Sequence, residues 1–291
     1  MWRPSTPCTP FAAPDHMALP VRSQRQAPSG MRDCGGAVPC RYYYHVPPGI
    51  SAASPVMVSV HGISLNAAEH LVRMRTQAER VGALLIAPWF DRTHYRGYQR
   101  LVCRGGQTRA DLALLAMIDD ATATFGGDCR RIHLAGFSGG GQFAHRFAAI
   151  HADRVAACVT TAAGWYTFPD EACPWPQGLS APTMPAGIAL HPAARQVPIH
   201  VLVGSRDNRP EPSLNATAAI VAQQGATRLD RASSWVAAMR EDRARHGGAD
   251  VTLTVIDRLD HDFSKAVDRH ALDALVVERL GLTQTKETDC A

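Results

Sequence analysis

The sequence predicts an α/β fold in which a mostly parallel central sheet is covered by helices on both faces. Between residues 41 and 280, short apolar runs alternate with segments whose apolar residues recur at helical spacing. The runs 55–60 and 199–203 are continuously apolar, as expected for strands that are buried on both sides. The 291 residues, 46% of them hydrophobic, are enough for a full core without disulfide or metal support. A single domain is therefore expected.

The first half of the chain is expected to form three strands and two helices. Pro47 and Pro88 end two of the strands, because proline lacks a backbone donor, and Gly126 ends the second helix. In order, these elements are strand 41–46, strand 55–60, helix 66–80, strand 83–87 and helix 108–125.

The second half continues the alternation but contains one irregular segment. Residues 164–197 include Trp165, Trp175 and six prolines with little periodicity, which predicts a lid or cap insertion. The strand at 251–256 alternates in part, so a place near the sheet edge is expected. The predicted elements are strand 132–137, a helix from 142, strand 155–161, strand 199–203, helix 230–246, strand 251–256 and helix 265–280.

The N-terminal segment differs from the rest. Residues 1–30 carry six prolines and no continuous apolar core, so a disordered tail is expected, followed by one domain over 31–291. With no recognisable signal peptide and no apolar run of transmembrane length, a cytoplasmic location without a membrane partner is expected.

The net charge of +4 is too low and too dispersed to indicate nucleic-acid binding. One local excess exists, because no acidic residue lies between Asp91 and Asp111. A solvated face is the simplest interpretation, and a positively charged substrate-binding loop is the alternative. The arginines of this loop are Arg92, Arg96, Arg100, Arg104 and Arg109.

Eight cysteines are too few for a disulfide scaffold in a chain of this length. Cys34 and Cys40 are close enough in sequence to pair locally, but their spacing does not match common zinc sites. We therefore predict no metal.

A serine lies between the predicted strand 132–137 and the helix that follows it. Residues 136–140 read Gly-Phe-Ser-Gly-Gly and match the GxSxG pattern, in which the serine stands on a sharp strand-to-helix turn. Glycines at the flanks remove side chains that would collide there. A phosphate-binding loop is the alternative, although no lysine follows and the GxGxxG and Walker spacings are absent. Ser138 is the candidate nucleophile.

A serine nucleophile needs a base, and the base needs an anionic partner. Asp207 and His261 each follow a later predicted strand, so both should lie at the same sheet edge as Ser138. The order serine, acid, histidine is the one found with an elbow serine on this type of sheet. A turn-forming role is the alternative for Asp207. Asp260 and Asp262 flank His261 and are interpreted as turn or surface residues.

An oxyanion formed beside Ser138 needs two amide donors. Gly139 is expected to provide one, and Ile63, in the His61-Gly62-Ile63 loop after an early strand, the other. An ordinary glycine turn is the alternative for that loop.

The order of the HG loop, GxSxG elbow, late Asp and C-terminal His resembles the α/β-hydrolase superfamily over about residues 40–281. The run from Gly136 through Phe-Ala-His-Arg-Phe-Ala, with Asp153-Arg154-Val155, is similar to the polyhydroxybutyrate depolymerase-like and feruloyl or acetylxylan esterase group. That group's export signal and separate polymer-binding domain are not recognisable in this sequence. The resemblance implies ester hydrolysis through an acyl-enzyme at Ser138, without a cofactor.

An amidase or peptidase with the same triad, and a non-catalytic binding protein on the same fold, are the alternative functions. The expected partner is a small-molecule or oligomeric ester, and the arginine loop favours an anionic one. The sequence does not predict an oligomeric state. Candidate substrate-binding residues are His61, Trp165, Arg96 and Arg100, although tryptophans such as Trp165 equally often pack in a core.

Overall fold

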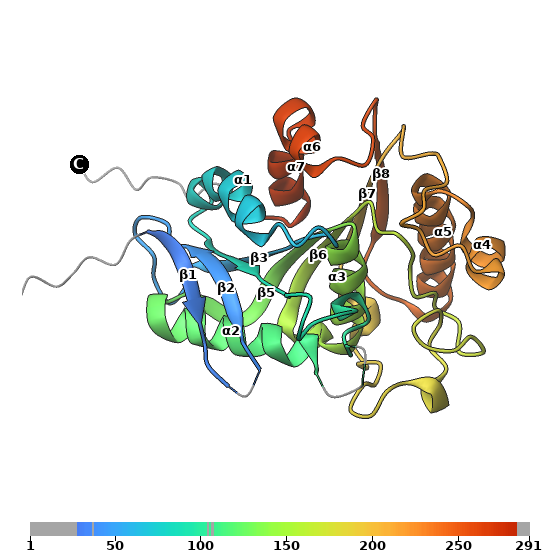
Figure 1. The fold of residues 1–291 in the computed structure, drawn as a ribbon, viewed down its shortest axis with the longest axis horizontal. Coiled ribbons are helices and arrows are strands. Elements are labelled where there is room, and N and C mark those ends of the chain that lie inside the picture. The colour runs from blue at the N-terminus through green and yellow to red at the C-terminus, as the bar shows by residue number, and fades with distance from the viewer. Residues whose placement is uncertain (1–27, 37, 104, 106–107, 284–291) are drawn as a thin grey trace, which may run out of the picture.

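The computed structural model describes residues 28–36, 38–103, 105 and 108–283 (Figure 1). Eight strands in this part of the chain form one sheet in the order β1-β2-β4-β3-β5-β6-β7-β8. β1 and β2 pair antiparallel, as do β2 and β4, and the pairs from β4 to β8 are parallel. The predicted mostly parallel sheet is confirmed. The strands are β1 (Ser29–Asp33), β2 (Arg41–His45), β3 (Pro55–Val60), β4 (Leu84–Pro88), β5 (Asp128–Phe137), β6 (Val155–Thr161), β7 (Ile199–Gly204) and β8 (Val251–Ile256).

Helices cover both faces of the sheet (Figure 1). One core lies between the sheet and α2 (Ala110–Phe125), α3 (Gly139–Ile150) and α5 (Arg228–His246). The other lies under α1 (Ala67–Arg80), α6 (Phe263–His270) and α7 (Leu272–Arg279). The two cores explain why β3 is continuously apolar: Val56, Val58 and Val60 face the first core and Met57 faces the second. No helix in the described ranges is both long and apolar enough to cross a membrane.

Every predicted strand and helix is present, but the structure adds or divides three elements. β1 begins with the last two residues of the predicted tail and pairs with β2 alone at the sheet edge. The short helix α4 (Ala218–Gln224) packs against α5. The predicted helix 265–280 is two helices, because Ala271 adopts a left-handed conformation with a φ of 50°. The rest of the predicted tail, residues 1–27, lies outside the described residues.

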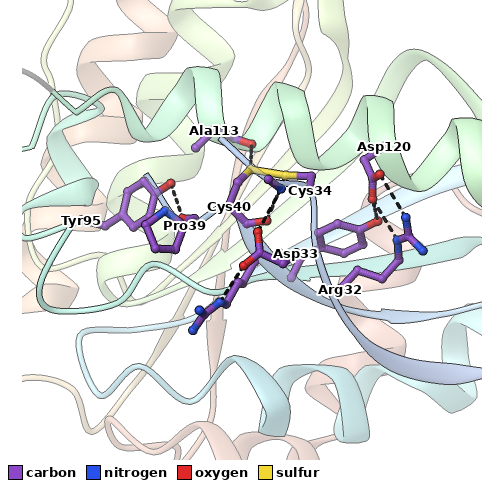
Figure 2. Close-up of a disulfide and its surroundings, with 11 residues drawn as sticks. Arg32, Asp33, Cys34, Pro39, Cys40, Tyr95, Ala113 and Asp120 are labelled. Atoms are coloured by element: carbon purple, nitrogen blue, oxygen red, sulfur yellow. Dashed lines mark hydrogen bonds and ion pairs between the residues drawn. A yellow bond between two sulfur atoms is a disulfide. The ribbon is translucent and has the colours of Figure 1, made fainter. Parts of the chain in front are cut away.

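A disulfide between Cys34 and Cys40 closes the connection between β1 and β2, in agreement with the local pairing that their spacing allows (Figure 2). The Cys34 amide also donates to the Cys40 carbonyl at 2.8 Å. Beside it, Arg32 of β1 forms two hydrogen bonds to Asp120 of α2. These contacts join the edge hairpin to a helix of the main core.

The segment 164–197, which the sequence predicts to be a lid or cap insertion, has little regular structure and is packed against the domain. Its 3-10 turns span Ala181–Thr183 and Ala194–Gln196. Tyr166 is fully buried and stacks on Trp235 of α5, with ring centroids 4.7 Å apart. The Trp235 indole donates to the Thr167 carbonyl at 2.7 Å. The beginning of the segment is therefore part of the core.

Candidate active site

Ser138 lies between β5 and α3 in strained backbone geometry. Its φ of 54° and ψ of −112° are unusual for a residue with a side chain. The Ser138 amide donates to the Thr161 carbonyl at 2.8 Å, which ties the turn to β6. A Cβ added at Gly136 would lie 2.1 Å from the Gly140 carbonyl oxygen, and one at Gly140 would lie 2.0 Å from the Val60 carbonyl oxygen. The tight strand-to-helix turn therefore requires both glycines.

The structure brings Ser138, Asp207 and His261 into one chain of hydrogen bonds. His261 Nε2 lies 3.0 Å from Ser138 Oγ, and His261 Nδ1 lies 2.9 Å from Asp207 Oδ2. A carboxylate can only accept, so Nδ1 carries the proton and Nε2 accepts from the serine hydroxyl. The Phe137 ring stacks on the imidazole at a centroid distance of 5.1 Å. His261 is thus held in the tautomer and orientation of a base toward Ser138.

Arg228, the first residue of α5, binds the other oxygen of Asp207. Its Nη1 donates to Asp207 Oδ1 at 3.0 Å and to Glu211 Oε2 at 2.7 Å, and its Nη2 donates to Ser213 Oγ at 3.0 Å. The Arg228 and Asp207 side chains are only 3% and 1% exposed. Sequence reasoning missed Arg228, because nothing in the local sequence places a residue 21 positions away beside the acid.

Replacing Arg228 with methionine should lower the free energy of unfolding by about 3–5 kcal/mol, because the Asp207 carboxylate would stay buried without its cation. Urea denaturation measures this loss. Glu211→Gln is the matched control, since Glu211 contacts the same guanidinium from a position 41% exposed. It should cost about 1 kcal/mol or less. Equal losses in the two variants would contradict a special role for the buried pair.

The two predicted oxyanion donors lie side by side. A Cβ placed on Gly139 would be 3.3 Å from the Ile63 amide nitrogen, and one on Gly62 would be 3.4 Å from Ser138 Cβ. The loop after β3 therefore passes directly against the nucleophile. The Gly139 amide begins α3, whose first amide groups have no carbonyl partner within the helix. The oxyanion role of the Ile63 and Gly139 amides stays a prediction.

The His61 side chain ties the loop after β3 to the residues that follow β4. Its side chain is fully buried, its Nδ1 donates to the Gly62 carbonyl at 2.7 Å, and its Nε2 accepts from the Phe90 amide at 3.1 Å. Burial lowers the pKa of His61 to about 4, so the ring is neutral. Tyr98 also donates to the His61 carbonyl, at 2.6 Å. With both ring nitrogens occupied, His61 is placed to hold the loop rather than to reach a ligand.

A surface depression opens over Ser138. The candidate triad contributes Ser138 and His261, and the Ile63 side chain, 47% exposed, stands at its border. Arg228 reaches the same depression from α5. Its remaining lining residues are Gly62, Ser64, Asn66, Phe137, Ser213, Asp262, Phe263 and Ser264.

The other predicted substrate-binding residues occupy different positions. Trp165 is 7% exposed and does not line the depression over Ser138, which agrees with the core-packing alternative. The guanidinium groups of Arg146 and Arg100 lie over its ring, at 4.5 Å and 5.8 Å from the centroid. Arg96 is exposed in a second depression, which adjoins the first at Ile63. Arg104, a member of the same arginine loop, lies outside the described residues.

Within the described ranges, no group of three or more His, Cys, Asp and Glu side chains is arranged to hold a metal ion.

No family model matches the sequence, and no curated protein matches it significantly. Solved structures do resemble it. Poly(aspartic acid) hydrolase-1 from Sphingomonas sp. KT-1 superimposes with a TM-score of 0.72 at 25% identity, covering 85% of this chain and 98% of its own. The poly(3-hydroxybutyrate) depolymerase LpqC from Bordetella parapertussis gives 0.62 at 24% identity, covering 81% and 87%. An S-formylglutathione hydrolase from Agrobacterium tumefaciens gives 0.56 at 16% identity, covering 87% and 95%.

These neighbours establish that the chain has the α/β-hydrolase fold, as the motifs predicted. The similarity to a poly(aspartic acid) hydrolase, at 25% identity, also supports a hydrolase.

Proposed function

We propose that this α/β-hydrolase-fold chain is a serine hydrolase that cleaves carboxylic esters through an acyl-enzyme on Ser138. The observation that carries the proposal is the chain of hydrogen bonds from Asp207 through His261 to Ser138. The adjacent Ile63 and Gly139 amides support it, because acyl transfer needs donors for the developing oxyanion. A protein that only binds a ligand would not need a hydrogen-bonded serine, histidine and aspartate next to two backbone amides.

In the proposed reaction, Ser138 Oγ attacks the ester carbonyl carbon while His261 Nε2 takes the hydroxyl proton. Asp207 Oδ2 stabilises the resulting imidazolium through the Nδ1 proton, and the Ile63 and Gly139 amides bind the oxyanion. Collapse of the tetrahedral intermediate breaks the bond to the alcohol oxygen, which receives the proton from His261. Water then attacks the acyl-enzyme with His261 again as the base, and the acid is released.

The proposed substrate carries negative charge. Exposed Arg92 and Arg96 line the depression next to Ile63, within reach of a substrate that extends from Ser138. Arginine binds carboxylates well because its fork of donors matches two oxygens. The similarity to a poly(aspartic acid) hydrolase supports this direction, since each unit of that polymer bears a carboxylate.

Amide hydrolysis is the second candidate, and the same similarity favours it, because poly(aspartic acid) is linked by amide bonds. The triad steps are the same, but His261 must protonate an amine, which is a poorer leaving group. The same residues would therefore cleave both bonds, and the amide would be cleaved more slowly than the matching ester.

Labelling with a fluorophosphonate probe tests the nucleophile, and a panel of matched ester and amide analogues tests the bond. We expect labelling at Ser138, located by peptide mass spectrometry, and faster cleavage of each ester than of its amide. Failure to label Ser138 would favour the non-catalytic alternative. Faster cleavage of the amides would make the chain an amidase.

A further inference from the structure

The depression over Ser138 continues into a neighbouring depression on each side. On one side it shares Ile63 with the depression of Arg92 and Arg96, which follow β4. On the other side it shares His261 with a depression of residues that follow β7 and β8. In the sheet, β4 and β7 lie on opposite sides of β5, the strand that ends at Ser138. The three depressions therefore adjoin one another along this sheet edge, with the candidate nucleophile in the middle one, and we call this row of depressions the groove.

Cationic side chains stand at both ends of this groove. Arg92 and Arg96 are exposed at one end, and Arg206 and Arg209 are exposed at the other. In the part of the chain that the structure describes, none of these four side chains takes part in an ion pair. Their guanidinium groups remain available for a ligand.

The carboxylates along the groove already have partners within the protein. Asp91 accepts from His94, and Asp260 accepts from Lys265 Nζ at 2.6 Å. Glu211 shares Arg228 with Asp207. Lys265 and Arg228 are the cations among these partners, and Asp262, which also lines the groove, accepts from the Lys265 amide. The four exposed arginines face solvent.

We propose that this groove binds a linear polyanion, with carboxylate-bearing units on both sides of Ser138, and that an acyl bond inside the chain is cleaved. The inference rests on the proposed function of Ser138 and extends it. Cleavage of an internal bond requires that units be bound on both sides of Ser138, and arginines lie on both sides of it. The substrate class is an oligomer or polymer in which each unit carries a carboxylate, rather than a small anionic ester.

Two double variants test the two ends separately, namely Arg92→Gln with Arg96→Gln and Arg206→Gln with Arg209→Gln. The matched control is Arg75→Gln with Arg80→Gln, which removes the same charge from exposed positions on α1 outside the groove. The probe is a set of ester-linked malic acid oligomers, which carry one carboxylate per unit. p-Nitrophenyl acetate reports the activity of Ser138 without charge recognition.

Binding is measured by calorimetry in the Ser138→Ala background, where the oligomers are not consumed. Each groove pair should weaken binding by about tenfold at low salt, and the α1 pair should change it less than about twofold. With active protein, the Arg75→Gln and Arg80→Gln control should keep its rate on p-nitrophenyl acetate. Fragments of several units should appear before free malate.

The outcomes separate the two proposals. Unchanged oligomer binding in both groove variants, or loss in one only, would overturn the two-sided groove even if the neutral ester is hydrolysed. Release of single units from the start would overturn internal cleavage. A wild-type protein that binds the oligomers through both arginine pairs but hydrolyses neither ester nor amide would instead overturn the proposed function and keep the polyanion groove.

Discussion

Replacing Ser138 with alanine should lower ester turnover by on the order of a thousandfold or more, because the Ser138 hydroxyl is the proposed nucleophile and is hydrogen-bonded to the His261 base. The substitution keeps Cβ and removes only Oγ, so the turn between β5 and α3 should be retained. The His261 imidazole would lose its 3.0 Å hydrogen bond, and the oxyanion donors would remain. Initial rates on p-nitrophenyl acetate, with thermal denaturation as the check on folding, measure the effect.

Ser64→Ala is the matched control for this experiment. Ser64 lines the same depression and its hydroxyl donates to Asn66 at 3.0 Å, but it makes no contact in the proposed triad. It should retain activity within about threefold of wild type, as expected for an exposed polar group outside the reacting atoms. Near wild-type esterase activity in Ser138→Ala would rule out the assignment of the nucleophile.

Replacing Asp207 with asparagine should reduce kcat on the order of 10⁴-fold, through the wrong histidine tautomer. Arg228 can only donate, so it should draw the amide oxygen of the new asparagine toward itself. The amide nitrogen would then face His261 Nδ1 and donate to it. The imidazole proton would move to Nε2, where it blocks acceptance of the Ser138 proton. Steady-state kinetics on a neutral ester, with substrate well above KM, measures the loss.

The orientation of the new amide at position 207 should depend on Arg228, and a double variant tests this dependence. Adding Arg228→Met to Asp207→Asn removes the donor that holds the amide, so the amide can turn and present its oxygen to His261. The double variant should then be more active than Asp207→Asn alone, by on the order of tenfold if the productive orientation becomes accessible. Equal or lower activity in the double variant would show that Arg228 does not set the orientation of residue 207.

Local patterns of apolar residues in the sequence were sufficient to predict most of the strands and helices. The run at β3 is continuously apolar because alternate residues enter two different cores, and this can be read without the structure. β1 and α4 were missed for a related reason, since a five-residue edge strand with polar positions and a seven-residue helix carry little periodic signal. Ala271 gives no sign in sequence that it divides a helix.

The sequence by itself determined the α/β-hydrolase fold and the set of Ser138, Asp207 and His261, because each follows a recognisable strand. Parallel strands bring their carboxyl ends to one edge. Only the tertiary structure decided what surrounds this set. Trp165 lies beneath two arginines, and His61 is buried beside Gly62 and Phe90. Arg228 reaches Asp207 from the start of a distant helix. Burial and side-chain partners depend on packing between segments far apart in the chain, which no local pattern records.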